Sequence, residues 1–194
     1  MKGRHGKAWV GILIGIVVVL LIGFSWYIGG YNRAIGLDER VDSGWAQIEN
    51  QLQRRNDLIP NLVNTVKGFA QQEREIFTEV TRLRSQWGQA QSREQQIETA
   101  NEMTGALSRL LLVAENYPQL KSNENFLALQ SQLEGTENRI AVERMRYNDA
   151  VRDFNQFRRS FFGRFFTNAA GVTEPAVYFE ATEDARTTVP EVVF

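Results

Sequence analysis

The chain has 194 residues, of which 43% are hydrophobic and 23% are charged, a composition typical of a folded protein. Its 22 basic and 23 acidic residues give a formal net charge of -1, which gives no reason to expect nucleic acid as a partner. Cysteine is absent and histidine occurs once, as His5, so disulfides, thiol nucleophiles, Cys/His zinc sites and histidine-dependent serine triads are excluded.

The first predicted element is a membrane anchor. A basic head over residues 1–8 is followed by residues 9–28, WVGILIGIVVVLLIGFSWYI, which carry no charge. As a helix this run would span about 30 Å, the thickness of the hydrocarbon core of a bilayer. Trp9 at one end and Trp26 and Tyr27 at the other are expected at the two membrane interfaces. The lipid bilayer is therefore the first expected partner.

A basic head before an apolar core is also the signature of a cleaved signal peptide. The end of this core, SWY, offers no A-x-A cleavage pattern, so we favour the anchor. Basic residues are more frequent before the anchor than directly after it, where only Arg33 and Arg40 follow. The positive-inside rule then places the head in the cytoplasm and the remaining chain on the other side of the membrane.

Two amphipathic helices are predicted next, each from apolar residues spaced three and four apart. The first continues from the anchor, with a bend at Gly29 and Gly30 as one option, and ends near RRNDLIPN. Its apolar stripe is Leu37, Val41, Trp45, Ile48 and Leu52. The second helix follows that turn. Its stripe is Ile59, Leu62, Val66, Phe69, Glu73, Ile76, Val80, Leu83 and Trp87.

SQWGQAQS is predicted to be a loop, and Ser92 with Gln95 fits a capping box for a third helix. That helix should end before Pro118, which disfavours helical geometry in the residue before it. A fourth helix should open near Ser122 or Asn123 and reach Phe166. The tail from Gly171 has no helical period, and its VYF and EVVF segments fit short strands or extended arms laid over the bundle.

Four helices with short connections predict an all-α protein, with an antiparallel four-helix bundle over residues 31–166 and an extended tail over residues 167–194. Helices one and three would leave the membrane, and helices two and four would return. The turns RRNDLIPN and NYPQLKSNENF should therefore be neighbours at the membrane-distal pole, about 37 Å of helix from the bilayer.

The end of the fourth helix, FNQFRRSFFGRFF, should lie at the membrane because that helix returns to it. Phenylalanine rings can enter the headgroup boundary while guanidinium groups meet phosphate. The alternative is that the rings cap the open end of the bundle beneath the tail. The expected interface residues here are Arg158, Arg159, Phe161, Phe162, Arg164, Phe165 and Phe166.

Two long segments carry a family resemblance. YNRAIGLDERVDSGWAQIENQLQRRNDLIPNLVNTVKGFAQQE and LLLVAENYPQLKSNENFLALQSQLEGTENRIAVERMRYNDAVRDFN are similar to the LemA family of bacterial membrane proteins. The resemblance implies a single-pass anchor, a four-helix bundle and association with the bacterial envelope, in some cases beside membrane peptidases or in specialised membrane compartments. We therefore expect the anchor to lie in the bacterial cytoplasmic membrane. It implies no catalytic residue. This chain departs from the family pattern at Gln72 and at SFFGRFF, where a proline often follows the first phenylalanine.

The RRNDLIPN turn has two interpretations. Asn56 or Asp57 could cap the next helix while Pro60 occupies its first turn, and this is the favoured structural role. Alternatively, exposed polar residues could dock a partner or a second copy of the chain. The candidate docking residues at this pole are Arg54, Arg55, Asp57, Pro60, Asn61, Pro118 and Lys121.

A polar layer is predicted inside the bundle because charged residues share the apolar face of the fourth helix. Buried charges need partners, which are expected to be each other's helix neighbours or residues at similar height such as Glu73 and Arg40. The layer residues are Glu73, Glu137, Arg144, Tyr147 and Asn148. Such a layer typically fixes helix register; acid and base catalysis would need a cleft that the sequence does not indicate. Asn148 and Asn155, seven residues apart, could bond a neighbouring helix or protomer, or face solvent.

The sequence therefore favours a non-enzymatic, membrane-anchored scaffold that self-assembles into a homo-oligomer at the envelope, with no cofactor and no metal. Gly11-x-x-x-Gly15 in the anchor is a weak dimerisation signal. The first alternative is a carboxylate-based enzyme or an accessory to membrane proteolysis. The second is a membrane-remodelling protein that acts through the Phe/Arg end of the fourth helix.

Overall fold

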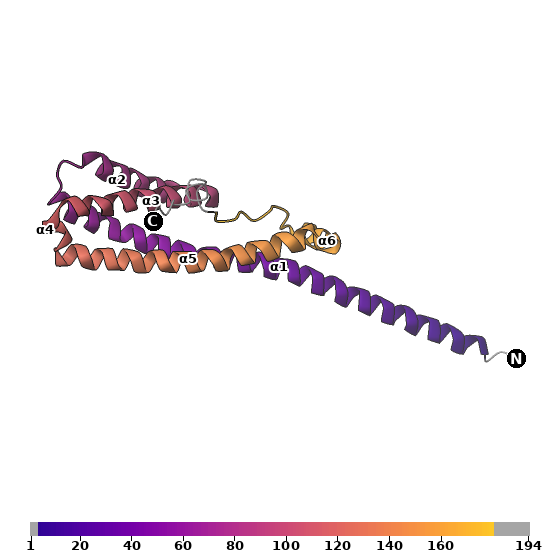
Figure 1. Cartoon of the computed structure of the whole chain (residues 1–194). Coiled ribbons are helices and arrows are strands. Elements are labelled where there is room, and N and C mark those ends of the chain that lie inside the picture. The colour runs from indigo at the N-terminus through magenta and orange to yellow at the C-terminus, as the bar shows by residue number, and fades with distance from the viewer. Residues whose placement is uncertain (1–3, 181–194) are drawn as a thin grey trace, which may run out of the picture. The chain divides into compact units, whose positions relative to one another are not determined.

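The structure, a computed structural model, describes residues 4–180, with side chains described from Trp9 onward. The elements are α1 (Arg4–Lys67), α2 (Arg74–Gln89), α3 (Arg93–Val113), the 3-10 helix η1 (Ala114–Asn116), α4 (Pro118–Lys121), α5 (Glu124–Arg159) and α6 (Phe161–Ala170) (Figure 1). No strand occurs between residues 4 and 180, which confirms the all-α class. VYF at residues 177–179 is not a strand, and EVVF at residues 191–194 lies outside the described residues.

The chain divides into two compact units. Unit 1 comprises Met1–Asp42 and Ala150–Ala176, and unit 2 comprises Ser43–Asp149 and Val177–Phe194. Helices α1 and α5 each contribute one part to either unit. The two units are described separately below.

Unit 2 is a bundle of four helices, α1, α2, α3 and α5, around one apolar core (Figure 1). The predicted stripes supply most of this core, because helical spacing of three and four places their side chains on one face. The buried members of the two stripes given above that belong to unit 2 are Trp45, Ile48, Leu52, Ile59, Leu62, Val66, Val80, Leu83 and Trp87. The later helices add Ile97, Met103, Leu107, Leu110, Ala114, Phe126, Leu133, Ile140 and Tyr147. Antiparallel packing of the bundle is confirmed.

The predicted turn at RRNDLIPN is wrong, because α1 continues through Pro60 to Lys67. A proline inside a helix has no N–H to donate to the carbonyl four residues earlier, here that of Asn56. Arg84 of α2 donates from Nε to this carbonyl oxygen over 3.2 Å and takes the place of the missing donor. Asn56 and Asp57 therefore lie within a helix and do not cap one.

The first connection of the bundle is the segment between Lys67 and Arg74, where the N–H groups of Phe69 and Ala70 both donate to the Val66 carbonyl. Helix α2 is consequently 16 residues long, shorter than the predicted second helix. This turn approaches the NYPQ segment, since the Tyr117 hydroxyl lies 3.5 Å from a Glu73 carboxylate oxygen. The expected neighbour of NYPQ was RRNDLIPN; the observed one is the Gly68–Glu73 turn.

The other predicted helix starts in unit 2 are confirmed. The Ser92 hydroxyl accepts from the Gln95 backbone N–H over 3.3 Å, and the Gln95 side chain accepts from the Gln91 N–H over 2.9 Å. Pro118 stands at the first turn of α4, where a missing N–H costs little. The Asn123 side chain caps α5 by accepting from the Phe126 N–H over 3.0 Å.

The N-terminus of α3 gives a small pH-dependent contribution to stability. Hydrogen bonding from its own backbone N–H, followed by the Ser92 hydroxyl, lowers the pKa of Glu94 below its ordinary value. A lowered folded-state pKa stabilises the fold above the unfolded pKa of about 4.3, and this contribution is lost as the pH falls. Because Glu94 is exposed and solvent screens its charge, we expect Glu94→Gln to lower the free energy of unfolding by only a few tenths of a kcal/mol at pH 7. The difference should vanish near pH 3 in denaturant titrations, and a difference that is equal at both pH values would contradict this assignment.

Unit 1 contains the one helix of the described residues that is long and apolar enough to cross a membrane, in the part of α1 that begins at Trp9. Helix α1 does not break at the paired glycines. Gly30 instead makes room for an aromatic ring, because a Cβ at this position would come within 2.2 Å of the Phe166 ring. The glycine therefore serves close packing of α6 on α1 within unit 1.

The fourth helix does not run unbroken to Phe166 as predicted. It ends at Arg159, and the Ser160 hydroxyl caps α6 by accepting from the Gly163 N–H over 3.1 Å. A Cβ on Gly163 would lie 1.8 Å from the Phe157 carbonyl oxygen, so the change of direction requires glycine here. Ser160 and Gly163 thus produce the bend between α5 and α6.

Candidate functional site

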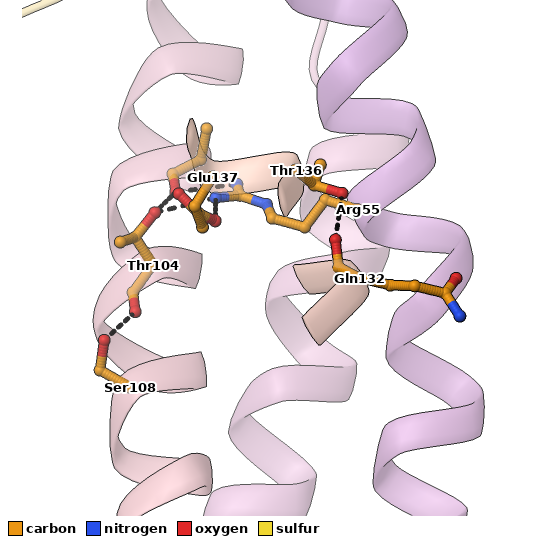
Figure 2. A network of polar contacts seen from close by, with 7 residues as sticks. Arg55, Thr104, Ser108, Gln132, Thr136 and Glu137 are labelled. Atoms are coloured by element: carbon orange, nitrogen blue, oxygen red, sulfur yellow. Dashed lines mark hydrogen bonds and ion pairs between the residues drawn. The ribbon is translucent and has the colours of Figure 1, made fainter. Parts of the chain in front are cut away.

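A buried arginine forms the centre of the polar network in unit 2. The Arg55 side chain is 2% exposed and reaches from α1 between α3 and α5 (Figure 2). One terminal nitrogen donates to a Glu137 carboxylate oxygen over 2.7 Å and to the Thr104 hydroxyl over 2.8 Å. The other terminal nitrogen donates to the Ala100 carbonyl over 3.0 Å. Three helices are therefore joined through one guanidinium group.

The network engages both charges of the ion pair. An arginine removed from water is tolerated when a carboxylate and further acceptors surround it, and here Glu137, Thr104 and Ala100 supply them. The Arg55 Nε has no hydrogen-bond partner among the described residues. The Glu137 carboxylate is 36% exposed, so water reaches its side of the pair. This geometry fixes the register of three helices and holds Glu137 as an acceptor.

A shallow hollow of about 310 Å³ opens beside the network between α3 and α5. Its lining is mostly apolar or neutral and includes Thr104, Leu107, Leu133 and Glu137. The described residues contain no group of three or more His, Cys, Asp or Glu residues that could hold a metal ion.

The polar layer is not assembled as predicted. Glu137 pairs with Arg55, which was not among the residues expected to pair with Glu137 or Arg144. Arg144 instead lies over the ring of Phe179, 5.1 Å from its centroid, and Glu73 meets Tyr117 at the first connection. The charged residues of the predicted layer therefore make three separate contacts and do not form one layer.

In unit 2 the tail is bound through its backbone. The Asn148 side chain donates to the Phe179 carbonyl over 3.0 Å and accepts from the Phe179 N–H over 2.9 Å. The Tyr147 hydroxyl donates to the Val177 carbonyl over 2.7 Å. Phe179 is 3% exposed, and its ring lies beside the Trp45 ring and beneath the Arg144 guanidinium group. This confirms an extended arm, held by an amide pair and one aromatic anchor.

The same device recurs within unit 1. The Asn155 side chain donates to the Ala176 carbonyl over 2.8 Å and accepts from the Ala176 N–H over 3.0 Å. Arg158 donates to the Thr173 carbonyl over 2.7 Å. The side-chain amides of Asn148 and Asn155 are therefore both hydrogen-bonded to the backbone of the tail.

Aromatic side chains join α6 to the end of the apolar run in unit 1. The Trp26 ring lies 5.3 Å from that of Phe162 and 4.9 Å from that of Phe166, and the Tyr27 ring lies 6.2 Å from that of Phe165. Phe166 is buried against Trp26 and Gly30 of α1. The other three rings remain exposed: Phe161 by 87%, Phe162 by 57% and Phe165 by 54%.

Unit 1 also contains a hollow, of about 500 Å³, that three arginines line. Its lining residues are Arg158, Arg159, Arg164, Thr167, Asn168 and Thr173. No carboxylate lines it, and the sequence holds no acidic residue between Asp153 and Glu174. The predicted interface residues of this segment thus lie together, whereas Trp9 lies at the other end of the apolar run.

The predicted distal residues do not form one polar rosette. Arg54, Asp57 and Asn61 are exposed on α1, whereas Arg55 is buried and Pro60 half-buried within the same helix. Pro118 and Lys121 are exposed at the two ends of α4. A polar residue that the sequence reasoning missed is Arg84, whose partner carbonyl lacks an intrahelical donor because Pro60 has no N–H.

Comparisons with known proteins give one family. The model of the LemA family matches residues 44–194. Similar curated proteins are Magnetosome protein MamQ 1 and MamQ 2 of Paramagnetospirillum magneticum, both 26% identical, and Magnetosome protein MamQ of Magnetospirillum gryphiswaldense, 24% identical. Each match covers 78% of this chain and 66% of the relative, so the chain spans just under two thirds of the length of these relatives.

Proposed function

We propose that this chain, which belongs to the LemA family, works as a membrane-anchored scaffold by associating with further copies of itself. The observation that carries this proposal is an exposed, uncharged stripe along α5 in unit 2. The family match, the helical fold and the long apolar helix all agree with a helical bundle that is associated with a membrane.

The α5 stripe follows helical spacings of three and four, which place its members on one face. Leu127, Val142 and Met145 are 48%, 43% and 61% exposed. Between them lie small or neutral exposed side chains. The complete α5 stripe is Leu127, Ser131, Gly135, Asn138, Val142 and Met145. Exposed apolar side chains aligned on one face are typical of protein association, and small residues let a second helix approach closely.

Membrane anchoring makes weak contacts between copies effective. A tether confines copies to a plane and raises their local concentration, so that a modest stripe contributes more than it would in solution. The anchor itself presents Gly11 and Gly15 on an open surface, because a Cβ at either would meet nothing within 4 Å. Small residues at this spacing favour close packing of two membrane helices.

The non-enzymatic part of the proposal rests on how the polar groups are engaged. Arg55 and Glu137 are paired with each other, and the amides of Asn148 and Asn155 are paired with the tail backbone.

We propose further that the anchor lies in the bacterial cytoplasmic membrane with the bundle outside, because basic residues are more frequent before the anchor than directly after it.

The absence of cysteine allows a direct test by oxidative cross-linking of the full chain in membranes. We expect single cysteines along the α5 stripe, such as Ser131→Cys and Val142→Cys, to form disulfide-linked dimers. Gln132→Cys is the matched control, exposed on the same helix but off the stripe. Adding Met145→Glu should reduce cross-linking at Ser131→Cys roughly tenfold, since an unpaired buried charge weakens association by at least about 1.4 kcal/mol. Equal yields at stripe and control positions would contradict the proposal.

A further inference from the structure

Where α5 ends and α6 begins, unit 1 combines exposed aromatic rings with a hollow lined by three arginines and by no carboxylate. Helix α6 carries the exposed rings of Phe161, Phe162 and Phe165. Two of these rings contact Trp26 or Tyr27, the residues that end the apolar run of α1. Tryptophan and tyrosine at such an end lie at the headgroup level of a bilayer. The exposed phenylalanines of α6 are therefore at the depth where rings enter the boundary between headgroups and acyl chains.

The hollow of about 500 Å³, which α6 lines through Arg164, Thr167 and Asn168, is suited to an anion. Arg159 and Arg164 are exposed and form no ion pair among the described residues. Arg158 uses one terminal nitrogen to bind the Thr173 carbonyl, while its buried Nε has no partner. Three guanidinium groups without a carboxylate repel one another, and a phosphate between them would relieve that repulsion and accept their hydrogen bonds.

We propose that this hollow binds the phosphate of an anionic phospholipid of the phosphatidylglycerol class. Arg158, Arg159 and Arg164 would hold the phosphodiester, and the side chains of Thr167, Asn168 and Thr173 offer partners for the glycerol hydroxyls. The acyl chains would lie along Phe161, Phe162 and Phe165. A free phosphate would use only the arginines, whereas a lipid uses the arginines and the rings on one short helix, and this pairing favours the lipid.

The proposal predicts selectivity for lipid charge. An anionic membrane surface attracts each nearby arginine by about 1 kcal/mol, which corresponds to roughly fivefold in affinity. Removal of all three arginines should therefore weaken binding of phosphatidylglycerol about a hundredfold. A zwitterionic lipid such as phosphatidylcholine lacks the net charge and should be bound much more weakly by the unmodified chain.

The test is native mass spectrometry of the full chain in detergent micelles, titrated with phosphatidylglycerol or phosphatidylcholine. We expect the unmodified chain to retain phosphatidylglycerol selectively and Arg158→Gln/Arg159→Gln/Arg164→Gln to lose this selectivity. Since Arg158 also binds the tail, Arg159→Gln/Arg164→Gln provides a second variant that leaves that contact in place. Arg54→Gln/Arg82→Gln/Arg139→Gln is the charge-matched control, with three exposed arginines of unit 2 removed. Equal retention of both lipids, or equal retention by the two triple variants, would overturn the proposal.

Two further arms separate a lipid from free phosphate. Phe161→Ser/Phe165→Ser should lower phosphatidylglycerol retention, because the acyl chains lose their contact surface. Inorganic phosphate at millimolar concentration should not displace the bound lipid. Displacement by inorganic phosphate, together with unchanged retention by the phenylalanine variant, would assign the hollow to a free anion and contradict the lipid site.

Discussion

Glu137→Gln is expected to lower the free energy of unfolding of the bundle by about 2 kcal/mol, because it leaves the buried Arg55 charge without its carboxylate. Breaking a fully buried pair costs about 3–5 kcal/mol, and the partial exposure of Glu137 reduces that cost. Urea denaturation of the full chain in detergent micelles measures the effect. Glu134→Gln, on an exposed residue three positions earlier in α5, should change stability by less than about 0.5 kcal/mol.

The double replacement Arg55→Met/Glu137→Leu distinguishes an unpaired charge from lost packing. Removing both charges removes the desolvation cost as well, so the double variant should be more stable than Glu137→Gln. A double variant that is as unstable as Glu137→Gln, or a Glu137→Gln variant no weaker than Glu134→Gln, would show that the pair does not hold the three helices.

Pro60→Ala is expected to raise the free energy of unfolding by about 2 kcal/mol, since a proline in a helix interior costs about 3 kcal/mol and Arg84 already compensates in part. Alanine at this position restores an N–H that can donate to the Asn56 carbonyl. Arg84→Met should cost about 1 kcal/mol with Pro60 present and clearly less in the Pro60→Ala background, because the carbonyl then has a second donor. A double-mutant cycle measures this coupling, and an equal cost of Arg84→Met in both backgrounds would exclude it.

The same proline explains where sequence reasoning failed. Asn and Asp beside Pro60 form a pattern typical of a helix start, and local rules favour a turn there. The carbonyl that Pro60 leaves unpaired is instead satisfied by Arg84, 28 residues away in the sequence. Such a long-range donor has no local signature. Elements with caps of their own, at Ser92 and Asn123, were predicted at the right places because the capping residue and its target lie within three positions.

Arg55 could have been recognised as a core residue. Ile48, Leu52, Ile59 and Leu62 are buried, and Arg55 falls between them at the same spacing of three and four. The stripe therefore runs unbroken past Pro60, which is a signal for one continuous helix. The predicted turn hid this pattern, and Arg55 was consequently assigned to an exposed docking surface.

The asparagines of α5 show a different limit. The sequence left two roles open for Asn148 and Asn155, a hydrogen bond to a neighbouring helix or protomer, or exposure to solvent, and neither describes what the structure shows. Their partners are backbone groups of Phe179 and Ala176 in a segment without helical period. Backbone recognition does not depend on which side chains the tail carries, so the tail sequence alone could not identify the contact. The aromatic cluster at the end of the anchor was predictable because composition and position both pointed to it.

The central claim is that the anchored chain associates with copies of itself, and the mass of the full-length particle tests it most directly. The chain is extracted from membranes within native lipid discs and its mass is measured across a range of expression levels. We predict particles that contain two or more copies, and particles with fewer copies for Val142→Glu/Met145→Glu. A full-length chain that remains strictly monomeric at every expression level would contradict the claim.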